Sequence, residues 1–227
     1  YAQRNTPGGD ALFIRLFEVI SRRGDFDEQA ILRNIPGADI VCFCDNYEPH
    51  FNRTREILGV TPRGYGDYRV MLEKEELDAV VITTPFHEHA RMTIDALNAG
   101  LHVLCEKAMA PTIEECNAMV EAHQKNNKIL HIGHQRLFNI KYLQAMKDIE
   151  EGLIGKVTQI RAYWHMNHDW RRPVPSPELE KKINWRLYEE FSCGLMTELA
   201  SHQIQVANWI LKEHPECAWG AGSINHW

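Results

Sequence analysis

The sequence predicts an α/β fold in which a doubly wound parallel sheet is followed by a partial α+β domain. Two observations carry this prediction. Short apolar runs alternate with helical patterns between residues 38 and 134, and the linkers between them are short, which is typical of repeated βα units. After Phe138 this alternation stops, and an aromatic, proline-rich stretch and one long amphipathic helix follow.

The first predicted domain covers residues 1–134 and contains the parallel sheet. Its strands are short apolar runs, predicted at Leu12–Ile20, Ala38–Cys44, Asp78–Thr83, Leu101–Cys105 and Ile129–Gly133. Helices are predicted at Pro49–Leu58, around Ala90–Leu97 and after Thr112. Thr112 and Glu115 have the spacing of a capping box, which opens the last of these helices.

The second predicted domain covers residues 135–227. Helices are predicted from Phe138 to about Gly152 and from Leu195 to Leu211, and strand-like runs at Lys156–His165 and Cys217–Ile224. Two strands and one long helix do not build a covered sheet, since strands need about three or more partners and a buried face. We therefore expect either that the chain is a fragment or that another molecule completes its second sheet.

The composition argues against several classes of partner. Of the 227 residues, 25 are Lys or Arg and 31 are Asp or Glu, and the formal net charge is −6. This mild acidity, without a basic run, argues against nonspecific binding to nucleic acid or to an anionic membrane surface. No apolar stretch approaches the roughly 18 residues that cross a bilayer. We expect a cytoplasmic protein, although the chain begins with Tyr1 and an upstream export signal stays open.

The cysteines and histidines do not predict a metal site. None of the six cysteines belongs to the paired C-x-x-C blocks of structural zinc. Buried, reduced thiols are expected at Cys42, Cys44, Cys105, Cys116, Cys193 and Cys217. His87 and His89 lie close together in the sequence, but the spacing identifies no third ligand for a metal.

Asp45 follows the predicted strand Ala38–Cys44 directly. A carboxylate at this position of a dinucleotide-binding fold hydrogen-bonds the adenosine ribose and repels a 2′-phosphate, which favours NAD over NADP. The alternative is an Asp that only opens a turn. The glycine-rich phosphate loop expected about 20 residues upstream is degraded, since Ser21–Asp25 offers only Gly24. This degradation argues against a normally bound cofactor.

Polar residues follow two further predicted strands, at the edge where ligands bind in parallel sheets. One group is the run Thr83–His89, and the other is Glu106 with Lys107. A partly desolvated Lys107 could exchange a proton or hydrogen-bond a substrate oxygen. The alternatives are that Lys107 forms a salt bridge and that His87 opens a helix.

Glu198, His202 and Gln205 stand at i, i+4 and i+7 of the last predicted helix, so they share one face. A carboxylate one turn away can fix the tautomer of a histidine and leave its other nitrogen to take a proton. The alternatives are a polar stripe that is merely exposed to solvent and an i, i+4 Glu/His pair that binds a metal.

Two aromatic segments, Tyr163–Pro173 and Asn184–Tyr188, combine rings with Asn, Arg and His side chains. Aromatic faces suit the C–H surfaces of a sugar, and the polar groups suit its hydroxyls. An ordinary core-and-rim segment would explain several of the same residues.

Together these motifs resemble the Gfo/Idh/MocA (glucose-fructose oxidoreductase / inositol dehydrogenase) family over residues 36–227. The resemblance rests on Cys44-Asp45, Thr84-Pro85 with His87 and His89, Glu106-Lys107, Gly133-His134-Gln135-Arg136, Gly152-x-Ile154-Gly155-Lys156-Val157, and Glu198 with His202. It implies a Rossmann-like N-terminal domain and a C-terminal α/β domain with a large open sheet used in oligomerisation. It also implies NAD(P)-dependent oxidation or reduction of sugars or cyclitols.

The resemblance further implies roles for particular residues. Lys107 would correspond to the active-site lysine, His202 to the catalytic histidine, and Glu198 to an acidic residue that is usually Asp. The residues predicted to bind the cofactor are Asp45, Thr84, Pro85, His87, His89, Glu106, Lys107 and Gln135. The residues predicted to contact the substrate are Arg136, Trp164, His165, Asn167 and Trp185.

The leading hypothesis is an oxidoreductase of this family, or a fragment of one, in which Lys107 and His202 converge on a shared cleft. Its expected ligands are NAD, with NADP less favoured, and a sugar or polyol, and a homo-oligomer is expected to form through the C-terminal sheet. The alternatives are an NAD-dependent glycosidase of the same family and a cofactor-free binding or assembly subunit. The degraded glycine loop and the short sheet motivate the last hypothesis. The chain also departs from the family at Ala108, where proline is usual, and at Gln205, where Asp is common.

Overall fold

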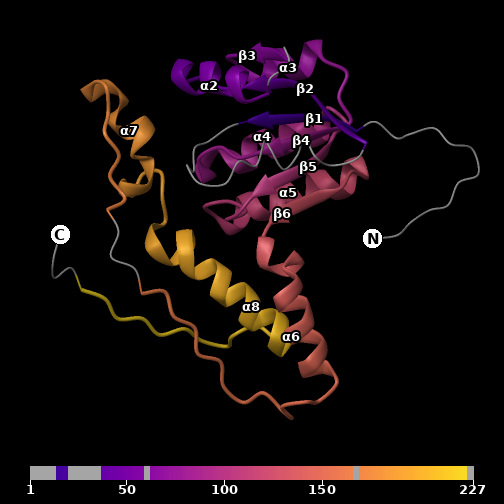
Figure 1. The fold of residues 1–227 in the computed structure, drawn as a ribbon, viewed down its shortest axis with the longest axis vertical. Helices are drawn as coiled ribbons and strands as arrows, with labels where there is room; N and C mark the ends of the chain where they lie inside the picture. The colour runs from indigo at the N-terminus through magenta and orange to yellow at the C-terminus, as the bar shows by residue number, and fades with distance from the viewer. Residues whose placement is uncertain (1–13, 20–36, 59–61, 166–168, 224–227) are drawn as a thin grey trace, which may run out of the picture. The chain divides into compact units, whose positions relative to one another are not determined.

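A computed structural model describes residues 14–19, 37–58, 62–165 and 169–223 of the chain. The chain forms two compact units (Figure 1). The first unit comprises residues 1–133 and 174–192, and the second comprises residues 134–173 and 193–227. The glycine loop expected at Ser21–Asp25 lies outside the described residues.

Six parallel strands form the sheet of the first unit, in the order β3-β2-β1-β4-β5-β6. They are β1 (Ile14–Val19), β2 (Ala38–Cys44), β3 (Arg63–Tyr65), β4 (Ala79–Ile82), β5 (His102–Glu106) and β6 (Leu130–Gly133). Because β1 pairs with both β2 and β4, the direction of winding changes between β1 and β4, which is the switch point of a doubly wound sheet. The predicted α/β class is therefore confirmed.

Four α-helices that the structure describes in this unit lie between its strands in sequence. They are α2 (Glu48–Leu58), α3 (Tyr68–Lys74), α4 (His89–Asn98) and α5 (Ile113–Asn126). The core joins the central strands to α4 and α5, which contact each other, and Val80, Leu97 and Met119 are at most 1% exposed. Burying a side chain of this size contributes about 1.5–3 kcal/mol, so these contacts hold the helices on the sheet.

The predicted capping box opens α5. The Glu115 amide donates to Thr112 Oγ1 at 3.2 Å, and the Thr112 amide donates to Glu115 Oε2 at 3.2 Å. The helix ends at Asn127, whose φ of 50° is left-handed and lets its amide reach back to the last turn. Both ends of α5 are therefore set by local sequence.

Two elements of the first unit, β3 and α3, were not predicted from the sequence. The three residues of β3 include Arg63 and Gly64 and form no apolar run. Gly64 is required there, because a Cβ atom would lie 2.2 Å from the ring of Phe51. The start of α3 is capped by Asp67, whose side chain accepts a hydrogen bond from the Arg69 amide at 2.9 Å.

The second unit is helical in the part that the structure describes. Its elements are η2 (Gln135–Phe138), α6 (Ile140–Glu150), the π-helix η5 (Met196–Ala200) and α8 (Ser201–Leu211). An ion pair of 2.7 Å between Lys212 and Glu150 ties the end of α8 to the end of α6. The predicted helix Leu195–Leu211 is thus present, but its first turn is wider than an α-turn.

The strands predicted in the second unit are not formed, and that prediction was wrong. Residues 156–165 and 217–223 carry no strand, and residue 224 lies outside the described part of the chain. A strand requires a hydrogen-bonded neighbour, and the described residues of this unit supply none.

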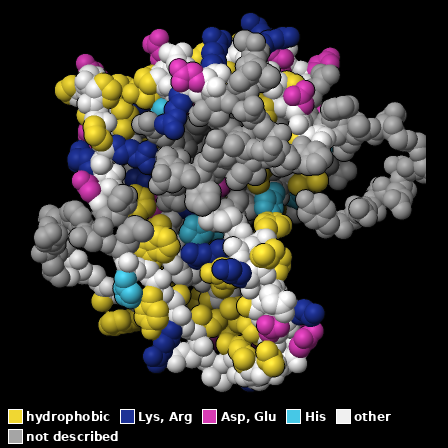
Figure 2. Space-filling view, in the orientation of Figure 1, with side chains coloured by type: hydrophobic (Ala, Val, Ile, Leu, Met, Phe, Trp, Pro, Cys, Tyr) yellow, Lys and Arg dark blue, Asp and Glu magenta, His cyan; other side chains and the backbone are white. Residues whose placement is uncertain are grey.

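Large apolar side chains of the second unit are exposed. They include Leu153, Ile154, Tyr163, Leu195, Met196 and Trp219, each at least 63% exposed. Figure 2 shows hydrophobic side chains gathered over the region of α6 and α8.

Three of the six cysteines are buried and two are exposed, while Cys116 is half-buried, and partial burial raises the pKa of its thiol. Cys42, Cys44 and Cys105 are buried in the sheet, and burial raises the pKa of each of these thiols to about 12. Cys193 and Cys217 are exposed, so the expectation that they are buried was wrong. Both lie in irregular segments of the second unit rather than in a strand. In the described residues, no helix is both long and apolar enough to cross a membrane.

Replacing Thr112 with Ala is expected to lower the free energy of unfolding by about 1 kcal/mol, because the cap of α5 is lost. Urea denaturation measures this difference. The control is Glu114→Ala, an exposed acidic residue of the same turn outside the capping box. Equal stability of Thr112→Ala and the unchanged chain would contradict the stabilising role of the cap.

Thiol labelling is expected to separate the cysteines. At pH 8 a coloured disulfide reagent should modify Cys193 and Cys217 rapidly, because the buried thiols with raised pKa values stay protonated. Cys42, Cys44 and Cys105 should react only after denaturation in urea. The double variant Cys193→Ser/Cys217→Ser should lose the rapid phase, and a rapid phase that persists would contradict the buried positions.

Candidate functional site

The polar residues predicted from the sequence gather at one edge of the sheet of the first unit. Val19 pairs with both Cys44 and Ile82, and Ile82 pairs with Cys105, so β2, β4 and β5 end at the same level. The turns that follow these strands carry Asp45, the Thr84-Pro85 pair and Lys107. This carboxyl edge, next to a switch point, is where open α/β sheets bind ligands.

Asp45 is buried at the end of β2, with its side chain only 4% exposed. One carboxylate oxygen, Oδ1, accepts a hydrogen bond of 2.7 Å from the Tyr47 amide. The other, Oδ2, has no hydrogen-bond partner among the described residues, and His50 Nδ1 lies 3.3 Å from it. A buried carboxylate oxygen without a hydrogen bond is costly, so this atom is suited to accept one from a ligand hydroxyl.

The turn after β4 contains a second buried oxygen of this kind. Thr84 is 9% exposed, and its Oγ1 has no hydrogen-bond partner among the described residues. Pro85 follows and begins the short helix η1 (Phe86–Glu88), which holds His87. The ring of His87 lies beside those of Phe191 and Trp185, with centroid distances of 4.9 and 5.9 Å. The His87 ring therefore packs against aromatic side chains at this edge, and it also brings a polar group there.

The turn after β5 holds Glu106 and Lys107. The Lys107 amide donates to Glu106 Oε2 at 3.1 Å, and the Lys107 side chain is half-buried. Glu106 lies over Gly133 of the neighbouring strand, where a Cβ atom would come within 2.9 Å of Glu106 Oε1. Glycine at 133 therefore leaves the space that this carboxylate occupies. The peptide bond between Lys107 and Ala108 is cis.

His89 is the most deeply buried of the predicted polar residues, at 1% exposed. It begins α4, and both of its ring nitrogens lie against backbone carbonyl oxygens of the two turns just described. Its imidazole therefore belongs to the wall between the ends of β4 and β5.

A segment from the second half of the sequence, residues 174–192, belongs to the first unit and crosses the same edge. It contains η3 (Pro177–Leu179), α7 (Glu180–Ile183) and η4 (Trp185–Leu187). Trp185 is 4% exposed and lies against Phe86, with ring centroids 6.2 Å apart. Lys182 Nζ donates to the Asn46 carbonyl oxygen at 2.8 Å. The segment thus contacts the turns after both β2 and β4, on either side of the switch point.

In the second unit the predicted pair Glu198 and His202 is buried. Each is 6% exposed, and no other residue of η5 or α8 is buried as a whole. Buried polar side chains normally form hydrogen bonds. A helix that buries a carboxylate and an imidazole rather than its apolar residues therefore favours a functional role for these two polar side chains. His202 lies edge-on to His134, with ring centroids 6.1 Å apart. The orienting of His202 by Glu198 stays a prediction.

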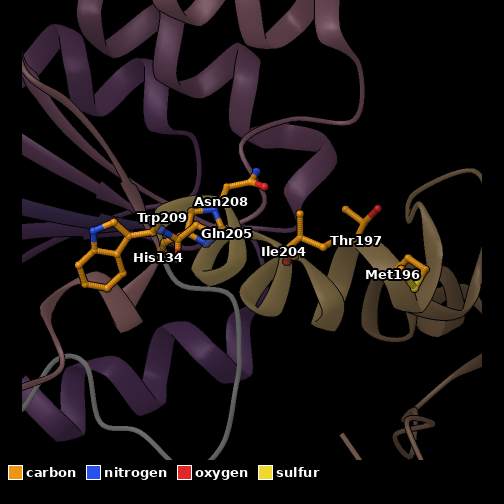
Figure 3. A pocket seen from close by; sticks show the side chains of 8 residues that line it. His134, Met196, Thr197, Ile204, Gln205, Asn208 and Trp209 are labelled. Carbon is orange, nitrogen blue, oxygen red and sulfur yellow. The ribbon is translucent and has the colours of Figure 1, made fainter. Parts of the chain in front are cut away.

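A hollow of about 650 Å³, which we call the α8 hollow, lies along η5 and α8 (Figure 3). It is lined by His134, Met196, Thr197, Ser201, Ile204, Gln205, Asn208 and Trp209. Ser201 Oγ and Gln205 Oε1 are buried without a hydrogen-bond partner among the described residues. The α8 hollow therefore combines an aromatic ring with polar atoms that can still take hydrogen bonds.

The other predicted site residues lie in η2 and in the segment after α6. Gln135 is exposed in η2, and the Arg136 guanidinium lies 6.0 Å from the ring centroid of Tyr142. Trp164 and His165 are exposed in an irregular segment. Asn167 lies outside the described residues.

The structure brings the predicted residues together in two groups. Asp45, Thr84, Pro85, His87, His89, Glu106, Lys107 and Trp185 belong to the first unit. Gln135, Arg136, Trp164, His165, Glu198 and His202 belong to the second. Since Lys107 and His202 are in different units, their convergence on one cleft stays a prediction.

Several residues of these sites were missed from the sequence. Ser201 and Asn208 have a helical spacing with Gln205, at i, i+4 and i+7, which could have placed them beside the polar stripe. His134 follows the end of β6, which is the same signal that selected Asp45 and Lys107. Lys182 carries no such signal, because only tertiary structure brings it to Asn46.

Polar atoms at the carboxyl edge of the first unit fit the adenosine ribose of a dinucleotide. Asp45 Oδ2 has no hydrogen-bond partner among the described residues, although His50 Nδ1 lies 3.3 Å from it, so it can accept a hydrogen bond from a ribose hydroxyl. The hydroxyl of Thr84 is a second polar group at the same edge. In the ranges that the structure describes, no three His, Cys, Asp or Glu side chains are grouped as metal ligands.

Comparison with known proteins gives two matches to family models. Residues 21–134 match the oxidoreductase family with an NAD-binding Rossmann fold (GFO_IDH_MocA), and residues 142–226 match the GFO/IDH/MocA C-terminal domain. An inositol 2-dehydrogenase of Salmonella typhimurium is 28% identical over 184 residues, which are 81% of this chain and 50% of that protein. A levoglucosan dehydrogenase of Pseudarthrobacter phenanthrenivorans is 33% identical over 152 residues, 65% of this chain and 36% of that protein.

A solved structure shows the same arrangement of elements. The crystal structure of myo-inositol 2-dehydrogenase from Lactobacillus plantarum matches with a TM-score of 0.72 at 26% identity, over 88% of this chain and 56% of that one. The chain spans about half the length of the curated inositol dehydrogenase that it matches. From these matches and from its parallel sheet, the chain belongs to the Gfo/Idh/MocA family of oxidoreductases, whose N-terminal domain is an NAD-binding Rossmann fold.

Proposed function

We propose that the chain takes part in NAD-dependent oxidation or reduction of a hydroxyl-bearing carbon of a sugar, polyol or cyclitol. The observation that carries the proposal is the buried carboxylate of Asp45, whose Oδ2 has no hydrogen-bond partner among the described residues at the end of β2. A ribose 2′-hydroxyl would supply the missing hydrogen bond, whereas a 2′-phosphate would meet a negative charge. This argument favours NAD over NADP.

Under this proposal the cofactor is held by the carboxyl edge of the first unit. Asp45 binds the ribose, and Thr84, Pro85, His87, Glu106 and Lys107 are the other proposed contacts, with Gln135 from the second unit. Both ring nitrogens of His89 face backbone carbonyl oxygens, so His89 is assigned no direct contact. Bound NAD supplies the acceptor for a hydride from the substrate carbon.

The acid–base chemistry is assigned to the chain's own side chains. His202, oriented by Glu198, accepts the proton of the substrate hydroxyl, and the ammonium of Lys107 stabilises the oxygen as it becomes a carbonyl oxygen. The C–H bond breaks as the hydride leaves, and the two electrons of the O–H bond form the second C–O bond. In the reverse direction His202 returns the proton. Burial of both Glu198 and His202 supports this assignment, because electrostatic interactions are stronger where water is excluded.

The proposed substrates are polyhydroxylated rings. The α8 hollow offers Ser201, Gln205 and Asn208 for hydroxyl groups and Trp209 for a C–H face. Arg136, Trp164, His165, Asn167 and Trp185 are further proposed contacts. The named relatives are dehydrogenases of inositol and of levoglucosan, which are compounds of this kind.

Calorimetric titration of the full chain with NAD and with NADP tests the cofactor. We expect saturable binding of NAD, weaker binding of NADP, and a loss of NAD affinity of roughly 10- to 100-fold in Asp45→Ala, because a hydrogen bond to a charged group is removed. The control is Asp39→Ala, an exposed carboxylate at the other end of β2. Absence of a saturable NAD signal would favour the cofactor-free subunit, and unchanged affinity in Asp45→Ala would remove the ribose assignment.

His202→Ala is expected to lower kcat on the order of 10²- to 10⁴-fold with little change in NAD affinity, because a general base is lost while the cofactor edge is intact. NADH formation with myo-inositol, scyllo-inositol and levoglucosan measures this effect. The matched control is His214→Ala, an exposed histidine beyond α8. Equal turnover of His202→Ala and the unchanged chain would contradict the assignment.

The same assays separate the glycosidase alternative, because a glycosidase would release sugar from a glycoside without accumulating NADH. A homo-oligomer through the second unit is also part of the proposal. The exposed apolar side chains of that unit support it, since large exposed apolar patches commonly mark interfaces.

A further inference from the structure

His89 holds together the two turns that carry the cofactor and lysine positions. Its Nδ1 lies 2.8 Å from the Ala108 carbonyl oxygen, and its Nε2 lies 3.0 Å from the Thr84 carbonyl oxygen. The ring is 1% exposed, and Thr84 is 9% exposed. Both contacts have the length of N–H···O hydrogen bonds, and both acceptors are backbone atoms in turns between secondary-structure elements.

These two contacts bridge segments that are distant in sequence. Thr84 follows β4, and Ala108 follows Lys107 at the end of β5. Nineteen residues separate His89 from Ala108, so the contact is tertiary rather than a local turn. The contact to Ala108 is partly buried, so loss of the His89 donor leaves this carbonyl oxygen without its protein donor, at a cost in free energy. The turn would relieve that cost by moving, and Lys107 is the residue next to the carbonyl that would move.

We propose that His89 is a positioning residue, which donates from Nδ1 to the Ala108 carbonyl oxygen and thereby fixes the place of the Lys107 ammonium. The proposal rests on the proposed function, because that function assigns Lys107 to the reacting oxygen. It gives His89 a role through the backbone and not by contact with cofactor or substrate. A carbonyl oxygen only accepts hydrogen bonds, so the contact at 2.8 Å requires a proton on Nδ1, and the proposal assigns one there.

Asparagine and glutamine separate the two contacts. The amide nitrogen of Asn can occupy a position close to that of histidine Nδ1, and that of Gln a position close to Nε2. His89→Asn is therefore expected to keep the contact to Ala108, and His89→Gln to keep only the contact to Thr84. The matched control is His123→Asn on α5, where Nδ1 also faces a backbone carbonyl, that of Lys128.

The first measurement needs neither cofactor nor substrate. Lysines of the full chain are dimethylated with carbon-13, and the Lys107 resonance is identified by its absence in Lys107→Arg. We expect the shift and titration midpoint of this resonance to change in His89→Gln and to match those of the unchanged chain in His89→Asn and His123→Asn. Identical Lys107 resonances in all folded variants, or a change in His89→Asn as large as in His89→Gln, would overturn the proposal.

The second measurement uses turnover. His89→Gln should lose kcat on the order of 10²-fold with a smaller change in KM, because misplacement of a catalytic group by about 1 Å has an effect of this size. His89→Asn should restore most of kcat. If the unchanged chain binds no NAD and turns nothing over, the proposed function fails, while the Lys107 resonance still decides the positioning role. Retained kcat in His89→Gln would overturn the proposal.

A third measurement guards against variants that fail to fold. Nitrogen-15 shifts of the histidine rings in the unchanged chain report which nitrogen of each ring carries a proton. We expect a protonated Nδ1 in His89. A ring with its proton only on Nε2 would overturn the proposal without any substitution.

Discussion

The candidate site depends on the burial of polar atoms at the carboxyl edge of one parallel sheet. Parallel strands that end at the same level bring their following turns together, and the packed core beneath excludes water from them. Asp45, Thr84 and His89 are each at most 9% exposed at this edge. Buried polar atoms normally form hydrogen bonds. At this edge the ring nitrogens of His89 face backbone carbonyl oxygens, whereas Asp45 Oδ2 has no hydrogen-bond partner among the described residues and can accept one from a ligand.

The second unit differs from the first in the side chains that it buries. It buries Glu198 and His202, while large apolar residues such as Leu195 and Trp219 are exposed. A hydrophobic surface of this extent is ordinarily covered by a sheet or by another chain. The sequence between the two parts of this unit returns to the first unit, where Trp185 and Lys182 contact the turns after β4 and β2. Residues 174–192, which separate the two parts of the second unit in the sequence, therefore lie over the carboxyl edge of the first unit's sheet.

Much of the first unit could be predicted from the sequence, because local signals fix it. The apolar runs of β2, β4 and β5 and the capping box of Thr112 reflect interactions within a few residues. Asp45 and Lys107 could be selected as site residues because the end of a parallel strand is itself a site signal.

The remainder depends on contacts between distant residues, which periodicity does not report. The strand β3 is only three residues long and lacks an apolar run, so its place in the sheet comes from pairing with β2. The run Lys156–His165 has the composition of a strand, but a strand exists only where a neighbour accepts its hydrogen bonds. The bridging role of His89 was equally hidden, because nothing in its neighbourhood of the sequence indicates Ala108 as a partner.

The central claim is that the carboxyl edge of the first unit receives a dinucleotide. Hydrogen–deuterium exchange of the full chain, measured by peptide mass with and without NAD, tests it most directly. We predict that NAD slows exchange in the peptides that contain the turns after β2, β4 and β5, and leaves the peptides at the opposite ends of these strands unchanged. Exchange that is unaltered by saturating NAD, or slowed only outside these turns, would contradict the account.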